Sequence, residues 1–143
     1  MVLVSALAAL LLAASTSAPG PAEAASLVLD FPDLKPQGQV TVALFANDTA
    51  WRGRKQAVRT AQIQLADAGA QARFEGLAPG VYGVMAYHDR NANGRLETLP
   101  IGLPIEPYGF SRNARGAFGP PAWEAAAVRI EAGETRTEQV RLR

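Results

Sequence analysis

The stretch FEGLAPGVYGVMAYH, residues 74–88, decides the fold. Phe74 ends one segment of strand character, and Pro79-Gly80 forms a turn, because proline presets its φ angle and glycine accepts a positive φ. From Gly80 to His88 the sequence is almost continuously apolar, which is typical of a strand at the centre of a sheet. The stretch therefore predicts two consecutive strands that are joined by a tight turn.

Short segments of strand character occur on both sides of this stretch, and turn residues separate them. The predicted strands are Ser26–Phe31, Gln39–Phe45, Val58–Leu65, Ala70–Glu75, Gly80–His88, Ala125–Ile130 and Thr135–Leu142. In the second of them Val40, Val42 and Leu44 share the face that we expect to be buried. This pattern predicts an all-β fold, a single seven-stranded antiparallel β-sandwich.

The segment 89–124 has little strand or helix pattern and contains five glycines and five prolines. It also holds large apolar side chains, such as Ile101, Phe110 and Trp123, which favour burial over disorder. A connection of this length is uncommon in a compact domain and is usually functional. We therefore expect one long ordered loop packed over one end of the sandwich, and we expect the functional site there.

The first residues, MVLVSALAALLLAASTSA, indicate export. They are apolar and then small, and the run is too short for a comfortable membrane span. Ala22 and Ala24 stand at the two positions that a signal peptidase reads, so we expect a signal peptide over 1–24 and a mature domain over 25–143. No Lys or Arg precedes the apolar run, so a retained N-terminal anchor is the alternative. Cleavage predicts a periplasmic or secreted protein without a transmembrane span.

Composition excludes several classes of function. The chain has no cysteine, which excludes disulfides and thiolate chemistry, and its formal net charge is +1. Arg52-Gly-Arg54-Lys55 is a single short basic cluster, typical of a solvated loop, and it is too weak for a nucleic-acid partner.

The loop HDRNANGRLE, residues 88–97, has the spacing of a calcium site. The residues at the first, third, fifth, seventh and ninth positions of such a loop are Asp89, Asn91, Asn93, Arg95 and Glu97, with Arg95 offering its backbone carbonyl. Short oxygen-bearing side chains on alternate residues can converge on one hard cation. The twelfth position is Pro100, where an EF-hand has a bidentate glutamate, so any Ca²⁺ affinity should be low.

A metal-free turn is the alternative for this loop. Asp and Asn side chains bond to their own backbone in Asx-turns, and Asn93-Gly94 is a strong turn pair. The residues leave both interpretations open, with Ca²⁺ as the only cofactor indicated.

His88, the only histidine, supports an enzymatic alternative. A hydrolase-like enzyme would use His88 with Asp89 or Glu106, and it needs an exposed histidine beside an open space. No serine lies in a nucleophile-elbow pattern, so a structural, hydrogen-bonded histidine is the expectation. A buried His88 bonded to backbone would exclude the enzymatic alternative.

The second half of the long loop interleaves aromatic rings with arginines and an asparagine. Such groups can bind sugars or anionic groups. The candidates for ligand binding are His88, Glu106, Tyr108, Phe110, Asn113, Arg115 and Phe118. The same groups can instead tie the loop to itself, with Arg115 paired to Asp89, Glu97 or Glu106.

Two resemblances extend this interpretation. The pattern F-x-G-L-x-P-G-x-Y over residues 74–82 resembles the strand junction of transthyretin-like and carboxypeptidase-regulatory-like sandwiches, which implies the fold alone. The motifs H-D-x-N-x-N-G-x-L, Y-G-F-S-x-N-A-R-G and F-G-P-P resemble a family of small exported bacterial proteins with a domain of unknown function. Glu97 and Trp123 depart from its pattern, where Asp and Phe are usual.

The family supplies no activity to carry over, and its shared loop residues are candidates only. We expect an exported, non-enzymatic binding or structural module of the bacterial cell envelope. Its partner is expected to be an unidentified envelope ligand or protein.

Overall fold

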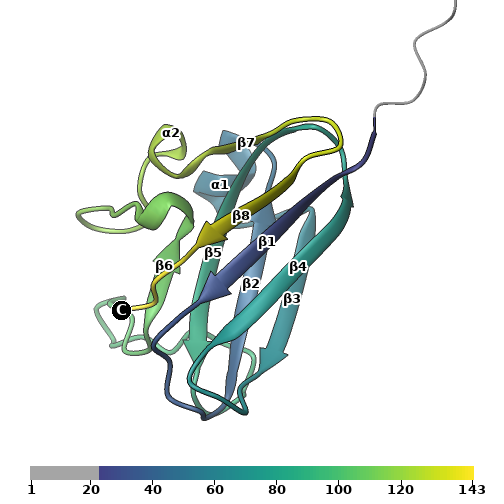
Figure 1. Cartoon of the computed structure of the whole chain (residues 1–143). Coiled ribbons are helices and arrows are strands. Elements are labelled where there is room, and N and C mark those ends of the chain that lie inside the picture. Colours follow the sequence, from purple (N-terminus) through teal and green to yellow (C-terminus); the bar gives the residue numbers. More distant parts are fainter. Residues whose placement is uncertain (1–22) are drawn as a thin grey trace, which may run out of the picture.

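Two β-sheets face each other across an apolar core (Figure 1). The computed structural model describes residues 23–143, so residues 1–22 of the predicted signal peptide lie outside the described part. The elements are β1 (Ala25–Phe31), β2 (Gln39–Phe45), α1 (Asp48–Gly53), β3 (Arg59–Gln64), β4 (Ala70–Leu77), β5 (Gly80–Asp89), β6 (Tyr108–Phe110), the 3-10 turn η1 (Ser111–Asn113), α2 (Trp123–Ala126), β7 (Val128–Ile130) and β8 (Thr135–Gln139). None of the helices in residues 23–143 is long and apolar enough to span a membrane.

The larger sheet has the order β3-β2-β5-β6, and β7 pairs with the start of β5. The apolar strand predicted for residues 80–88 is its centre and runs on to Asp89. β6 comes from within the segment 89–124, which raises the number of strands to eight. The prediction of seven strands was therefore wrong, because three residues inside a long loop give no readable alternation.

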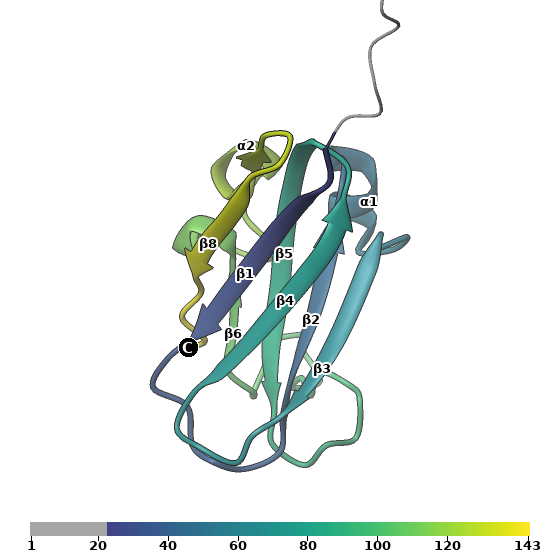
Figure 2. The same ribbon diagram turned by 45° about the vertical axis from the view of Figure 1, so that its right-hand side comes forward.

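The smaller sheet has the order β4-β1-β8, and Figure 2 shows it in front of the larger one. β1 and β4 are antiparallel, but β8 runs parallel to β1, with Leu27 opposite Arg136. The prediction of an entirely antiparallel fold was thus wrong. After β7 the chain crosses from the larger sheet to the smaller one, and it then continues beside β1 in the same direction.

The core lies between the sheets and comes from their facing sides. The predicted inward face of β2 is confirmed, because Val40, Val42 and Leu44 are fully buried. Leu27 and Leu29 of β1 meet them from the opposite sheet. Because side chains alternate along a strand, the polar residues between these positions lie on the outer faces.

A second apolar cluster lies on the other face of the larger sheet, beneath α1 and α2. Trp51 of α1 is its centre, 1% exposed, with its ring edge-to-face against Phe45, Phe110 and Trp123 at centroid distances of 5.8–5.9 Å. Its indole Nε1–H donates to the Pro121 carbonyl at 2.8 Å. The cluster holds the segment after β6 against the sheet.

The C-terminal residues close one side of the molecule. The N–H of Val140 donates to the Asp30 carbonyl at 2.8 Å, which extends the β1–β8 pairing. Three residues later the chain has moved to β6, where Arg143 and Tyr108 exchange N–H to carbonyl bonds at 3.0 and 3.1 Å. This crossing brings the chain's last arginines against the long loop.

Candidate functional site

The buried carboxylate of Asp89 organises the loop that follows β5. Its Oδ1 accepts the Asn93 N–H at 3.1 Å, and its Oδ2 accepts the Gly94 N–H at 2.7 Å and the Gln39 Nε2–H at 2.9 Å. Burial favours a higher pKa for Asp89, but these hydrogen bonds, from Gln39 first, outweigh it and lower the pKa. The carboxylate is therefore ionised at neutral pH and holds the turn.

The asparagines form turns with the backbone. The side-chain oxygens of Asn91 and Asn93 accept the N–H groups two residues ahead, at 3.3 and 2.8 Å, and both amide nitrogens donate to Glu97 Oε1. Amide oxygens thus face the backbone, and N–H groups face Glu97.

The predicted ligands Asp89, Asn91, Asn93 and Glu97 come together here but do not form a shared cage of oxygens, and Arg95 contributes its N–H to the Asn93 turn. Nowhere in residues 23–143 are three or more His, Cys, Asp or Glu side chains grouped to hold a metal ion.

Glu106 joins the two ends of the same loop. Its Oε1 accepts the Arg90 N–H at 3.0 Å, and its Oε2 accepts the Glu97 N–H at 3.1 Å. The side chain is buried, and both oxygens are used by the backbone. The predicted pairing of Arg115 with this carboxylate or with Asp89 and Glu97 is not present among the salt bridges of residues 23–143.

His88 is also structural in its contacts. Its side chain is buried, and the ring Nε2 lies 2.6 Å from the Gln37 carbonyl oxygen. The backbone N–H of His88 donates to the Pro107 carbonyl at 2.8 Å. The hydrolase-like alternative needs this ring exposed beside an open space. The structure instead has a buried histidine whose ring lies against a backbone carbonyl, so His88 does not meet that requirement.

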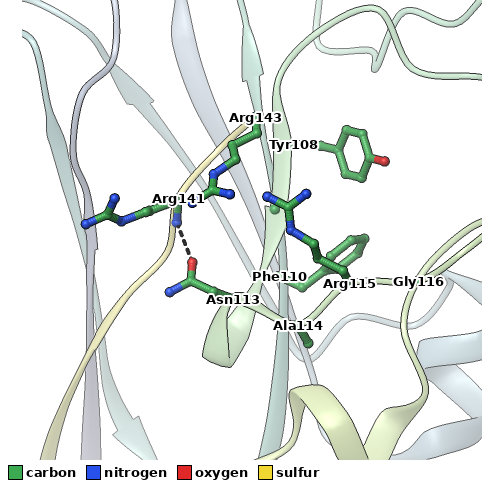
Figure 3. A pocket seen from close by; sticks show the side chains of 9 residues that line it. Tyr108, Phe110, Asn113, Ala114, Arg115, Gly116, Arg141 and Arg143 are labelled. Atoms are coloured by element: carbon green, nitrogen blue, oxygen red, sulfur yellow. Dashed lines mark hydrogen bonds between the residues drawn. The ribbon is translucent and has the colours of Figure 1, made fainter.

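A pocket of about 140 Å³ lies between β6, the turn after it and the C-terminal segment (Figure 3). Four of the seven predicted ligand-binding residues line it. The lining residues are Tyr108, Gly109, Phe110, Asn113, Ala114, Arg115, Gly116, Arg141 and Arg143. His88 and Glu106 are not among them, and neither is Phe118, whose side chain is fully exposed elsewhere on the long loop.

The turn η1 builds one side of this pocket. Arg112 and Asn113 adopt left-handed backbone conformations, with φ of 57° and 50°, and these reverse the chain after β6. The Asn113 Oδ1 accepts the Arg141 N–H at 2.9 Å, and its Nδ2 donates to the Gln139 carbonyl at 3.2 Å. Asn113 therefore holds the C-terminal segment through both the oxygen and the nitrogen of its side-chain amide. Contacts to a ligand would then come from the neighbouring residues.

Close approach of the C-terminal segment requires a glycine in β6. A Cβ atom at Gly109 would lie 2.4 Å from the Arg141 carbonyl oxygen, a distance that no side chain permits. Because Gly109 has no side chain, the segment that carries Arg141 and Arg143 can lie directly over β6. The glycine of the motif Y-G-F-S is thus explained by packing, because it leaves room for the C-terminal segment.

The arginine side chains that line the pocket take part in no salt bridge within residues 23–143. Arg115 and Arg143 extend their guanidinium groups into one opening, whereas the Arg141 side chain points away (Figure 3). The salt bridges within residues 23–143 involve Arg52, Arg73 and Arg136 instead. The Tyr108 ring, in edge-to-face contact with Phe110 at 5.8 Å, forms an apolar wall beside the two guanidinium groups.

Arg141 and Arg143 are the lining residues that the sequence did not reveal. They lie at and beyond the end of the predicted strand Thr135–Leu142, far from the loop along the chain. Their spacing of two would place them on one face of a regular strand, but only the Arg143 side chain extends into the opening (Figure 3). Nothing in the sequence indicates that this segment leaves β8 and pairs with β6.

Comparison with known proteins gives one match. The model of an uncharacterized protein family conserved in bacteria, DUF2141, matches residues 34–138, most of the chain and the whole long loop. No curated protein matches, and no solved structure matches. The resemblance to a bacterial family of unknown function is confirmed: the chain belongs to the DUF2141 family of uncharacterized bacterial proteins.

Proposed function

We propose that the protein is an exported, non-enzymatic binding module of the bacterial cell envelope, and that the pocket beside β6 is its ligand site. One observation carries the proposal: Arg115 and Arg143 line a single opening, and no acidic side chain in residues 23–143 pairs with either of them. Two like charges facing one space favour an anion between them.

The chemistry of the pocket suggests the class of ligand. Guanidinium groups bind carboxylate, phosphate or sulfate through paired N–H donors. A volume of about 140 Å³ suits one such group rather than a whole cofactor. The ring of Tyr108 would then contact a planar or apolar part of the ligand next to its charge. We therefore propose an anionic ligand with an aromatic or sugar-like body.

Two observations support the cell envelope as the location. The N-terminal sequence has the apolar run and small residues of a signal peptide, and the family is bacterial. For the fold, the two facing sheets support a place among transthyretin-like sandwiches, although β8 is parallel to β1.

Titration with small anions tests the pocket directly. We expect inorganic phosphate to shift the backbone amide NMR signals of Gly109, Ala114 and Gly116 with weak, millimolar affinity. Phenyl phosphate should bind more tightly because its ring adds contact with Tyr108, and uncharged phenol should bind least. Shifts spread over the surface without a maximum at these three amides would contradict the proposal.

For residues 89–97 we propose a hydrogen-bonded turn that needs no metal. The oxygens of Asp89 already accept three N–H groups, and the amide N–H groups of Asn91 and Asn93 face Glu97 where a cation would require oxygens. As arranged, the donor set fits Ca²⁺ poorly.

Thermal unfolding in millimolar Ca²⁺, Mg²⁺ or EDTA tests this turn. A cation that binds only the native state raises the midpoint by mass action. We expect midpoints that agree within about 1 °C in all three conditions, because there is no such binding. A rise that is selective for Ca²⁺ and is lost in Glu97→Gln would show that the turn is a calcium site.

A further inference from the structure

A row of four side chains crosses the outer face of the larger sheet and begins at the pocket beside β6. Each comes from one of four neighbouring strands, and each is the cross-strand partner of the next (Figure 1). The members of this tyrosine row are Tyr108, Tyr87, Thr41 and Gln62. Strands lie about 4.8 Å apart, so the row runs over about 14 Å, well beyond the pocket itself.

The rows on both sides of the tyrosine row are covered. On one side, Met85 and Ala43 pack against the aromatic cluster beneath α1 and α2. On the other side, Asp89 and Gln39 are buried, and the turn after β5 is bonded to the Asp89 carboxylate. Within the tyrosine row, the two end residues are exposed and the two middle residues are half-buried. The row is therefore an accessible strip between two covered ones.

The two tyrosines of the row are close neighbours. The His88 N–H donates to the Pro107 carbonyl at 2.8 Å, which makes these two residues a hydrogen-bonded pair of the β5–β6 ladder. The next pair along the ladder, Tyr87 and Tyr108, is then of the non-hydrogen-bonded kind, in which side chains stand closest together. Because Tyr108 also lines the pocket, Tyr87 continues the aromatic wall of the pocket onto the face of the sheet.

The chemistry of the row suits a saccharide. Aromatic rings pack against the C–H faces of sugar rings, and phenol, hydroxyl and amide groups bond to sugar hydroxyls. No member of the row carries a formal charge, so the row suits a neutral sugar. A peptide that adds as a strand needs free backbone groups, but β2 and β5 already have a strand on each side. An acyl chain would leave Thr41 and Gln62 without polar partners.

We propose that the ligand of the pocket is an acidic oligosaccharide, whose acidic group binds between Arg115 and Arg143 while the neighbouring sugar ring packs on Tyr87. This inference rests on the proposed function, because it takes the arginine pocket as the site of the acidic group. It adds the class of the ligand and a second subsite, for a neutral sugar, on the face of the sheet. Gln62 lies at the far end of the row, where a longer saccharide would reach it.

Calorimetric titration with three saccharides tests the second subsite. Glucuronic acid carries the acidic group alone, cellobiuronic acid adds one glucose to it, and cellobiose has two rings without the acid. We expect cellobiuronic acid to bind about fivefold more tightly than glucuronic acid, because its second ring contacts Tyr87, and cellobiose to bind least. Equal affinities for the two acids would overturn the second subsite and leave the anion pocket in place. If neither acid binds, the saccharide is excluded, and if inorganic phosphate does not bind either, the pocket fails as well.

Two substitutions of Tyr87 provide a second arm. Tyr87→Ala should bind the two acids with equal affinity, because the second ring has lost its contact, while its Kd for glucuronic acid stays that of the wild type. Tyr87→Phe is the matched variant: it keeps the aromatic ring and should keep most of the fivefold difference. Circular dichroism checks that both variants are folded. A fivefold difference that persists in a folded Tyr87→Ala variant would overturn the assignment of Tyr87 to the subsite.

Discussion

Replacing Asp89 with alanine is expected to lower the free energy of unfolding by about 3–5 kcal/mol. The carboxylate is fully buried and accepts N–H groups from Gln39, Asn93 and Gly94. Its removal leaves three N–H donors without their acceptor, and the donor from Gln39 is buried. Urea unfolding followed by circular dichroism measures the loss.

The pH dependence of stability gives an independent signature of Asp89. Hydrogen bonding lowers its pKa in the folded state below the 3.8 of an unperturbed aspartate. The stability that it contributes is therefore complete above the unfolded-state pKa and is lost as the pH falls through the lower folded-state pKa. The stability difference between wild type and Asp89→Ala should accordingly shrink below about pH 4.

Asp67→Ala provides the control for both measurements. Asp67 is exposed in the loop between β3 and β4, so its replacement should change the stability by less than about 0.5 kcal/mol. If Asp89→Ala cost no more than Asp67→Ala, the carboxylate would not be the organiser of the loop.

Trp51→Ala is the second large effect, with an expected loss of about 3–5 kcal/mol. The indole is 1% exposed, contacts three aromatic rings and donates to the Pro121 carbonyl. Its loss opens a cavity beneath α2 and removes the support of Phe110, which lines the pocket. We therefore expect weaker binding of phenyl phosphate together with the lower stability.

Trp51→Phe separates packing from hydrogen bonding at this position. The phenyl ring keeps most of the aromatic contact but cannot donate to Pro121, so the loss should be smaller, about 1–2 kcal/mol. Denaturant unfolding of the two variants gives the comparison. Equal losses would mean that the hydrogen bond, rather than the packed ring, holds the cluster.

The core strands could be predicted because local pattern determines them. The alternation of Val40, Val42 and Leu44 and the apolar run 80–88 each give the buried face without knowledge of a partner strand. The three residues of β6 carry no such pattern. They become a strand only because β5 offers them a free edge, which is a property of the whole fold.

The candidate site was predictable in its composition but not in its assembly. Tyr108, Phe110 and Arg115 could be selected as aromatic and cationic groups within one loop. Arg143 joins them only through the crossing of the C-terminal segment onto β6, which Gly109 permits. Glu106 was selected for its charge, yet its oxygens bind backbone N–H groups, and its partners depend on how the loop folds back.

Calorimetric titration with phenyl phosphate at low salt tests the central claim, the anion pocket, most directly. The comparison is between the wild type, Arg115→Gln and Arg129→Gln, in which the last removes an exposed arginine of β7 that does not line the pocket. We predict a Kd about tenfold higher for Arg115→Gln and an unchanged Kd for Arg129→Gln, because Arg115 donates to the bound anion and Arg129 does not. Equal affinities for all three proteins would contradict the assignment of this pocket as the ligand site.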